Sequence, residues 1–553
     1  MPTASKTNVT PEALASVNCA YWAALKHIQL QAEEFTFKDH EYLEAPMNST
    51  ARKEVIMKGT QGGFTEAMVL RCLHGCIYKT YKKGVLYLFP TEKAVISFSN
   101  TRFNTLINNN PESIGAYIKL GRKSTDSSEL KKVGDSFIYF RSAYINVQPG
   151  DDVLKSTQLD SIPVDKVIFD EYDRMDSEAK KLALGRMAHS HIKQERYLSQ
   201  PSIHGYGIDV EWEGSNKSRW FRHCQRCNTF TSPDIEFDEH KDGNVNCIKM
   251  GRDGHGYIAC KKCGEPVDIF PGEWVAEKPD NPVIGRLWSQ FNSVYNDPME
   301  ILEQYHDPPD GDLASVFRLR LGQPYTPIED KLRIQDVYNC CTGERQQESS
   351  TLSCAMGVDI GKTKHIIIGY RISKHQYEII RVAQVKDWDD IHDLARRYNV
   401  KSAVIDIRPY EDEARRFQKA EPYLVMLCEY GDNALQEKHL DEKTMTIKAH
   451  RTSIFDATGR LFRDMKLICP RRDKDIDEFA RQCCNTAKRL ENNKRTGTDV
   501  YRYVKLGDEH YRNALNYFLL ACDKAPMVQP KLYGGQRYGQ GEPEFCRMDY
   551  SSV

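Results

Sequence analysis

Short apolar runs alternate with longer amphipathic stretches over the first 330 residues of the chain. Five runs have the length and composition of strands: 54–57, 84–91, 136–140, 166–169 and 195–201. The stretch 67–73 has helical spacing, and another helix-like stretch follows Pro90. Because strands that alternate with helices form a mostly parallel sheet, the pattern predicts an α/β domain.

A different order of elements begins near residue 351. Three strand-like runs come first, and a helix, a strand, a helix and a strand follow, at 355–360, 365–370, 377–385, 387–400, 402–406, 411–419 and 424–427. This β-β-β-α-β-α-β order predicts an RNase H-like fold. In that fold the first and fourth strands are neighbours.

A glycine-containing turn joins the first predicted strand to the first helix: Lys58-Gly59-Thr60-Gln61-Gly62-Gly63-Phe64-Thr65. A strand, a tight glycine loop and a helix N-terminus bind phosphate, because backbone N–H groups and the helix dipole face the anion. In the usual G-x-x-x-x-G-K-[ST] spacing, Gly63 is the second glycine and Thr65 the Mg²⁺-binding hydroxyl. Phe64 replaces the lysine, so we expect Lys58, at the first glycine's place, to supply the cation. An ordinary strand-to-helix turn would share this pattern.

Two carboxylates follow the predicted strand at 166–169. Beside a phosphate loop, Asp170 would hold Mg²⁺ through water, and Glu171 would polarise the water that attacks the γ-phosphate. The loop and the acid pair together predict an ATPase that uses ATP and Mg²⁺. The polar tip of the run at 195–201, which includes Gln200, is either a γ-phosphate sensor or a plain strand exit.

The 17 cysteines include two C-x-x-C pairs, Cys224/Cys227 and Cys260/Cys263. Four thiolates complete a closed tetrahedral Zn²⁺ site with no open position for catalysis. The polar segment between the pairs has little core of its own, which a metal would replace. We therefore predict a structural zinc ribbon, with strands at 257–258 and 269–270. Cys247 and His223 are the nearest alternative ligands.

Two carboxylates of the second domain lie on strands that we expect to be neighbours. Asp359 lies on its first strand and Asp406 ends its fourth, so the predicted order brings them together. Such a pair is unfavourable unless divalent cations neutralise it, which predicts a two-metal phosphodiester site with Mg²⁺ or Mn²⁺. We expect a third ligand from Asp508 at the start of a late helix, with Glu509 as the alternative. A local basic patch for phosphates is expected at 488–489 and 494–495.

Composition and charge limit how the protein could contact DNA or a membrane. The 553 residues carry 77 basic and 78 acidic side chains, so DNA contacts must come from local patches rather than a global field. No apolar run approaches membrane-spanning length. No secretory signal precedes the cysteines, which we expect to be thiols or metal ligands in a reducing compartment.

These motifs, in this order, resemble the large terminase subunit of tailed bacteriophages. A lysine at the loop's first position and an aromatic residue at the usual lysine site look like the lambda-like branch, as do 154–156, 169–173 and 321–325. The resemblance covers residues 30 to 525. The late helix departs from it, because the family's Asp-His-x-x-Asp-Ala is here Glu509-His510-Tyr511-Arg512-Asn513-Ala514. Asn513 cannot be a charged ligand.

The resemblance implies a packaging motor that hydrolyses ATP to move double-stranded DNA into a procapsid and cuts concatemeric DNA. It also implies that the chain forms a homo-oligomeric ring on a portal protein and has a small terminase subunit as partner. No membrane is expected to be involved, and the expected location is the host-cell cytoplasm, outside the mature virion. Two alternatives remain open. One is an ATP-dependent helicase or remodeller with an inactive RNase H-like domain, and the other is a non-catalytic zinc-bearing assembly protein.

The predicted organisation has seven segments. They are a leader or partner-binding segment at 1–45, which could also be a lid of the first domain, a P-loop ATPase core at 46–219, a zinc-ribbon insertion at 220–273, the ATPase completion at 274–330, a linker at 331–350, an RNase H-like nuclease domain at 351–528 and a flexible tail at 529–553.

Overall fold

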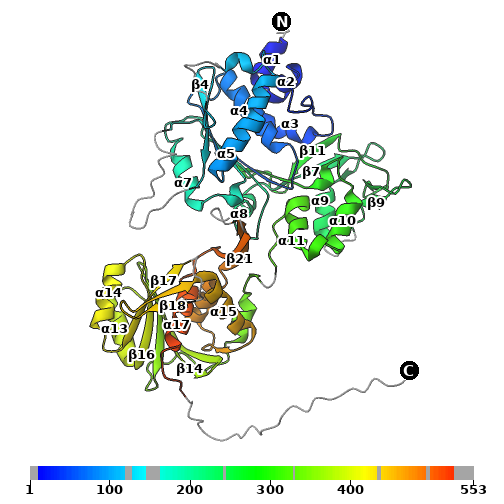
Figure 1. Ribbon diagram of the computed structural model, residues 1–553. Helices are drawn as coiled ribbons and strands as arrows, with labels where there is room; N and C mark the ends of the chain where they lie inside the picture. The colour runs from blue at the N-terminus through cyan, green and yellow to red at the C-terminus, as the bar shows by residue number, and fades with distance from the viewer. Residues whose placement is uncertain are drawn as a thin grey trace, which may run out of the picture. The chain divides into compact units, whose positions relative to one another are not determined.

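The computed structural model describes residues 10–118, 127–144, 162–240, 245–327, 330–431, 438–492 and 499–528. The chain divides into two compact units, Met1–Pro327 and Ile328–Val553 (Figure 1). Each unit is built on one large mixed sheet rich in parallel pairs, which confirms the predicted α/β class. The predicted tail at 529–553 and the motif at 154–156 lie outside the described residues.

The first unit has a ten-stranded sheet. Its spatial order is β11 (Gly272–Ala276), β7 (Ser218–His223), β12 (Ile284–Trp288), β1 (Lys53–Lys58), β6 (Gln194–Ser199), β5 (Lys166–Asp170), β2 (Val85–Phe89), β4 (Ser136–Ser142) and β3 (Leu130–Val133), with β8 (Phe230–Thr231) beside β7. The run from β7 through β12 and β1 to β4 is parallel throughout. All five strands predicted from apolar runs are therefore present.

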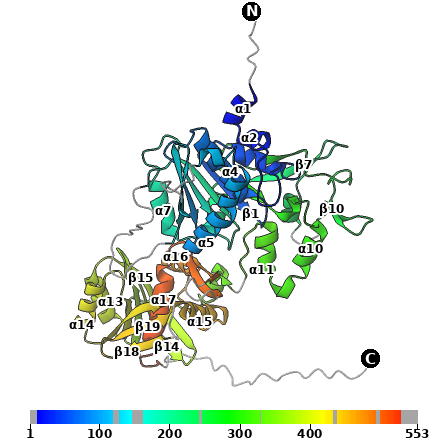
Figure 2. The same ribbon diagram turned by 45° about the horizontal axis from the view of Figure 1, so that its top comes forward.

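Alternate residues of a strand point to opposite faces of the sheet. Both faces of this sheet carry apolar side chains, and helices cover both. Ile56, Tyr87 and Ile168 face one core, and Val55 and Leu86 face the other. The helices of the unit are α1 (Pro11–Val17), α2 (Cys19–Leu25), α3 (Glu44–Asn48), α4 (Phe64–Ile77), α5 (Glu92–Phe98), α6 (Asn104–Asn109), α7 (Ser177–Gly185), α8 (Ile208–Glu213), α9 (Pro233–Glu239), α10 (Pro298–His306) and α11 (Leu313–Ser315). Helix α4 lies against the sheet near β1 (Figure 2).

The segment predicted as a leader is packed into the first unit. Trp22 and Tyr42 are each 1 % exposed and share a hydrophobic core with α4. Asn18 separates α1 from α2, and its side chain accepts a hydrogen bond from the N–H of Tyr21 and caps α2. The segment therefore packs on the phosphate-loop helix through side chains such as Trp22 and Tyr42.

The second unit has an eight-stranded sheet with the predicted strand order. Its spatial order is β18 (Lys438–Asp441), β19 (Thr446–His450), β17 (Leu424–Gly431), β16 (Val400–Asp406), β13 (Cys354–Asp359), β14 (Lys364–Ser373), β15 (Gln376–Val385) and β20 (Leu467–Ile468). β13 and β16 are parallel neighbours, with Val358 opposite Ile405. A separate hairpin is formed by β21 (Thr486–Asn492) and β22 (Asp499–Lys505).

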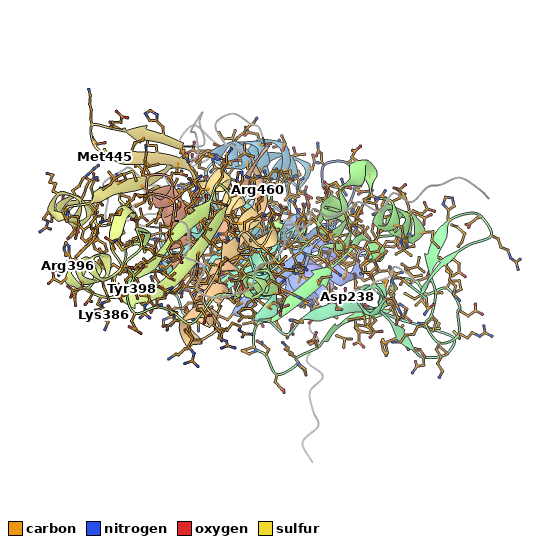
Figure 3. The ribbon with its side chains drawn as sticks, turned by 90° about the horizontal axis from the view of Figure 1, so that it is seen from below. Asp238, Lys386, Arg396, Tyr398, Met445 and Arg460 are labelled. Atoms are coloured by element: carbon orange, nitrogen blue, oxygen red, sulfur yellow. The ribbon has the colours of Figure 1, made fainter. Side chains whose placement is uncertain are left out.

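Six helices belong to this unit over its described residues: α12 (Ile334–Asn339), α13 (Trp388–Arg397), α14 (Glu411–Ala420), α15 (Arg451–Arg463), α16 (Lys474–Cys483) and α17 (His510–Cys522). α15, α16 and α17 pack on one face of the sheet, and α13 and α14 pack on the other. Arg396 and Tyr398 mark the end of α13 in Figure 3. α12 lies inside the predicted linker at 331–350 and buries Val337 in this core.

The region around the cysteine pairs differs in part from its prediction. β10 (Gly256–Ile258) contains the strand predicted at 257–258 and pairs with β9 (Ile248–Met250). The strand predicted at 269–270 is wrong, because neither residue belongs to a ladder, and Pro271, which follows them, has no N–H to donate to one. Over the described residues, no helix has both the length and the apolar character needed to cross a bilayer.

Candidate functional sites

The phosphate loop is held by later parts of the first unit. The N–H of Gly59 donates to the carbonyl of Trp288 at 2.9 Å, and that of Thr60 donates to the carbonyl of Leu319 at 2.8 Å. Gln290 donates through Nε2 to the hydroxyl of Thr60 at 2.8 Å. The N–H groups of Gly59 and Thr60, both predicted to bind phosphate, therefore already donate to carbonyl groups of the protein. The N–H groups that remain for a phosphate begin at Gln61.

The start of α4 is shaped for an anion. Gly63 has φ 74°, a left-handed conformation that glycine adopts without strain, and it provides no capping side chain for the helix. The first N–H groups of a helix have no intrahelical partner, and the helix dipole adds positive potential there. Thr65 lies in this first turn. A phosphate at this point would satisfy the exposed N–H groups.

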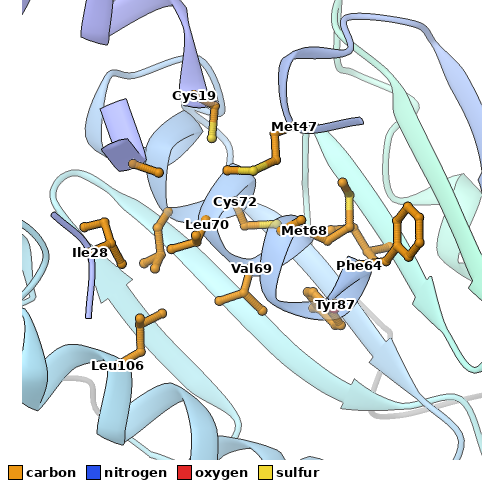
Figure 4. Close-up of a cluster of buried hydrophobic side chains, with 14 of the residues drawn as sticks. Cys19, Ile28, Met47, Phe64, Met68, Val69, Leu70, Cys72, Tyr87 and Leu106 are labelled. Atoms are coloured by element: carbon orange, nitrogen blue, oxygen red, sulfur yellow. The ribbon is translucent and has the colours of Figure 1, made fainter. Parts of the chain in front are cut away.

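The side chain of Phe64 points away from this anion position and into the core. It is 1 % exposed and packs against Tyr42 and Trp288, with ring centroids 5.6 and 5.9 Å away. Figure 4 shows Phe64 at the edge of the buried cluster, beside Met68. Phe64 can therefore contribute only its backbone to a nucleotide, and the usual lysine site is occupied by core.

The predicted cation and carboxylates meet around one cavity of about 430 Å³. Lys58, at the end of β1, is half-buried and makes no ion pair with a described residue. Asp170, at the end of β5, is 4 % exposed and accepts a hydrogen bond from the hydroxyl of Tyr87 at 2.8 Å. Gln61, Gly62, Gly63, Phe64, Thr65, Glu171 and Gln200 also line the cavity. The structure thus brings the predicted nucleotide residues together around this cavity, except Gly59 and Thr60, which do not line it.

Glu171 has the strained backbone that is frequent at functional sites. Its φ is 63°, unusual for a residue with a side chain. The carboxylate is half-exposed and pairs with Arg174 at 2.9 Å. Sequence reasoning missed the other wall of the cavity, where His40, Arg102 and Tyr295 lie, because these residues are distant in sequence and belong to no motif.

The four cysteines of the two C-x-x-C pairs converge. Sγ of Cys224 lies 3.6 Å from that of Cys263, and Sγ of Cys227 lies 3.5 Å from that of Cys260. Thiolates about 2.3 Å from a tetrahedral Zn²⁺ lie about 3.8 Å from one another, whereas a disulfide requires about 2.05 Å. The spacing fits an ion better than disulfides.

The two cysteine turns also share one backbone geometry. The N–H of Asn228 donates to the carbonyl of Cys224, and the N–H of Gly264 donates to that of Cys260, both at 2.9 Å. Asn228 and Gly264 both have positive φ. The alternative ligands are excluded: Cys247 is buried in a different cluster, and His223 contacts Asn228. The donor set therefore fits Zn²⁺.

Asp359 and Asp406 end adjacent parallel strands of the second unit, as the predicted order requires. Burial raises the pKa of Asp406 to about 7, and the negative charge of Asp359 adds to this effect. Burial also raises the pKa of Asp359, against the hydrogen bond from His510. A buried carboxylate beside a half-buried one whose ionisation it disfavours fits a divalent cation, which would stabilise both charges.

Two histidines complete a cluster with Asp359. Nδ1 of His510 lies 2.8 Å from Oδ2 of Asp359, and the ring of His365 stacks on that of His510 at 4.7 Å. A Cβ on Gly357 would lie 2.1 Å from the carbonyl oxygen of Ala514, so glycine lets α17 pack directly on β13. Ligand atoms of Asp359, His365 and His510 all lie within 4.8 Å of one another.

The predicted third ligand lies elsewhere. α17 begins at His510, so Asp508 precedes the helix instead of opening it, and its side chain is exposed. Asp508 lines a hollow of about 450 Å³ with His365 and His510 but is absent from the cluster around Asp359. Glu509 is bound by Arg451 through contacts of 2.9 and 3.0 Å. Whether Asp508 binds an ion stays a prediction.

The predicted basic patch is partly neutralised. Lys488 pairs with Asp456 at 3.0 Å, and Arg489 pairs with Glu491. The second part of the patch, at 494–495, lies outside the described residues. The two described side chains of the patch therefore offer less positive charge than their sequence suggests.

The sheet order and the loop–carboxylate site define a P-loop ATPase domain in the first unit. Residues 38–270 match the family model of the ATPase domain of the phage terminase large subunit gpA. The predicted relationship to tailed-phage terminase large subunits is confirmed over these residues, and the lambda-like branch stays a prediction. No curated protein matches the sequence significantly.

Solved structures similar to this chain include three large terminases. The HK97 bacteriophage large terminase is 9% identical, with 88% of this chain and 95% of that chain covered at a TM-score of 0.49. The large terminase of a thermophilic bacteriophage, in complex with ATP-gamma-S, is 10% identical, with 88% and 99% covered at 0.29. The Thermus phage P74-26 large terminase ATPase domain is 11% identical, with 52% and 96% covered at 0.30.

Proposed function

We propose that this protein is a DNA-packaging motor subunit that couples ATP hydrolysis to DNA translocation and also cuts DNA. The observation that carries the proposal is the presence, in one chain, of a terminase-type ATPase domain followed by a unit in which Asp359 and Asp406 end neighbouring strands of an RNase H-like order. A helicase or assembly protein would not need the second pair of carboxylates.

In the ATPase site, different groups of the chain bind the phosphates, the metal ion and the attacking water. The N–H groups from Gln61 to Thr65 hold the phosphates, and Lys58 neutralises their charge from the loop's opening. Thr65 and Asp170 would hold Mg²⁺, which withdraws charge from the phosphates when bound. Glu171 orients the attacking water. Its fixed backbone and its pairing with Arg174 keep the carboxylate at the cavity rim.

In the nuclease site, Asp359 and Asp406 hold Mg²⁺ or Mn²⁺ ions, with Asp508 as the predicted third ligand. Bound ions would activate water and stabilise the leaving oxygen of a DNA phosphodiester. Cys224, Cys227, Cys260 and Cys263 hold a structural Zn²⁺ that takes no part in either reaction. It stabilises the region between β7 and β11 by cross-linking its two turns.

The partners follow from this role. The substrate is concatemeric double-stranded DNA, and the chain acts as a homo-oligomeric ring on a portal protein of a procapsid, with a small terminase subunit, in the host-cell cytoplasm. A test uses the purified full-length chain with linear and plasmid DNA. We expect ATP turnover that DNA stimulates and plasmid cleavage that requires a divalent cation. A chain that turns over ATP but never cuts DNA with either Mg²⁺ or Mn²⁺ would support the helicase alternative.

A further inference from the structure

The ion site of the second unit has imidazole groups on one side. His510 contacts Asp359 at 2.8 Å, and the rings of His365 and His510 are nearly parallel, with an angle of 12° between their planes. The ligand atoms of these three side chains fall within 4.8 Å of one another. The cluster therefore combines one carboxylate with two nitrogen donors, a set that the two-carboxylate prediction did not contain.

His365 is an unusual residue for its place in the fold. It belongs to β14 between β13 and β15, and it is only 6 % exposed. Its Nδ1 is buried without a hydrogen-bond partner among the described residues. Native proteins rarely leave a buried polar atom without a partner unless a ligand or an ion completes the site, because its lost hydration is not replaced.

Nδ1 of His510 and Oδ2 of Asp359 face each other at 2.8 Å. Two ligand atoms this close can bind one ion side by side. Nδ1 is therefore the nitrogen of His510 that can share an ion with Asp359. The close packing of α17 at Gly357 holds this arrangement against β13.

Few carboxylates near the start of α17 are available as further ligands at this site. Asn513 carries no charge, Asp508 is exposed before α17, and Arg451 binds Glu509. Mg²⁺ prefers oxygen ligands, whereas imidazole suits divalent transition metals. A site that replaces a carboxylate by imidazole thus shifts preference away from Mg²⁺.

We propose that Asp359, His365 and His510 form a mixed imidazole–carboxylate site for a divalent transition metal, adjoining the ion position of Asp406. The inference rests on the proposed nuclease function and specifies the chemistry of that same centre. It makes His365 a direct metal ligand, a role that its position inside an apolar strand does not suggest. It also predicts that the centre selects Mn²⁺ over Mg²⁺.

The test measures the ligand atoms directly. Mn²⁺ is added to the metal-depleted full-length chain without nucleotide, and pulsed electron paramagnetic resonance records coupling of the Mn²⁺ electron spin to directly bonded ¹⁴N. We expect nitrogen coupling in the unaltered chain. His365→Gln and His510→Gln should each reduce the coupling and weaken Mn²⁺ binding on the order of tenfold or more. His375→Gln, an exposed position in the turn after β14, should change neither.

The outcomes separate this inference from the proposed function. Bound Mn²⁺ and metal-dependent cleavage without nitrogen coupling would overturn the imidazole site and leave the nuclease standing. Nitrogen coupling that persists unchanged in both variants would also overturn it. The absence of both Mn²⁺ binding and cleavage would overturn both proposals, whereas coupling that His365→Gln removes, in a chain that does not cut DNA, would uphold the metal site alone. The absence of nitrogen coupling in the unaltered chain overturns the imidazole site even if a variant fails to fold.

Discussion

The ring of Phe64 meets the indole of Trp288 edge-on, with centroids 5.9 Å apart and an angle of 73° between the planes. Position 64 is the usual place of the phosphate-loop lysine, and here it is filled by an aromatic contact inside the core. The loop therefore cannot obtain its cation from this position. Among the described residues that line the cavity, Lys58 is the lysine available to replace it.

Replacing Lys58 by alanine should reduce ATP turnover at least 100-fold, a change of about 2.7 kcal/mol in the barrier. The reason is the loss of the positive charge beside the phosphates. Steady-state ATPase assays with DNA present measure the effect. Lys82→Ala is the matched control, because Lys82 is exposed in the turn before β2. Turnover that survives Lys58→Ala would refute the assignment.

Phe64→Lys should not rescue the Lys58→Ala variant. The new ammonium would have to enter a core that contains Tyr42 and Trp288, where an unpaired charge is costly. We expect Phe64→Ala to lower the free energy of unfolding of the first unit by about 3–5 kcal/mol, as for other buried phenylalanines. Denaturant titration checks the stability. A stable Phe64→Lys protein with restored turnover would show that position 64 faces the nucleotide.

Serine at any of the four clustered cysteines should remove the metal and lower the thermal stability of the first unit. Elemental analysis of the unaltered chain should give one Zn²⁺ per molecule, and Cys260→Ser should give none. Cys247→Ser is the control, since Cys247 is buried nearby but outside the cluster and the zinc should remain. A folded, metal-free protein with four intact cysteines would contradict the zinc site.

Lys166 should give the first unit a distinctive pH dependence. Burial, reinforced by Arg196, lowers its pKa from 10.5 to about 7. Between pH 7 and 10.5 the unfolded chain therefore holds more protons than the folded one, and the contribution of this group to the free energy of unfolding rises with pH. Below pH 7 both states are protonated, and the contribution no longer changes.

Lys166→Met removes this dependence. The free energy of unfolding of the variant minus that of the unaltered chain should fall by about 1.4 kcal/mol for each pH unit between about pH 7 and 10. Denaturant titrations at several pH values measure it. A difference that stays constant across this window would mean that Lys166 keeps its ordinary pKa in the folded protein.

Sequence patterns predicted the strands well where burial on both faces leaves continuous apolar runs. β1, β5, β13 and β16 are of this kind, and the carboxylates that follow such runs, Asp170 and Asp406, could be located with them. The pairing of β13 with β16 followed from the order of elements alone. The cysteine cluster could be predicted because its ligands come in two short, recognisable spacings.

The histidines of the second unit could not be predicted in the same way. His365 sits before three isoleucines and has the pattern of an ordinary strand residue, and its neighbour His510 lies far away in the sequence. Only the packing of α17 on Gly357 brings them together. Asp508 was placed at a helix start because helix boundaries are uncertain by a residue or two, and here the helix begins at His510.

The central claim is that one chain holds two separate active sites, and the most direct test measures both activities on the same preparations. Glu171→Gln should keep DNA cleavage and lose ATP turnover at least about 100-fold, and Asp359→Asn should do the reverse. Glu178→Gln, at a partly exposed position on α7, and Asp389→Asn, exposed on α13, are the controls and should retain both activities. ATP turnover that persists in Glu171→Gln, or cleavage that persists in Asp359→Asn, would contradict the account.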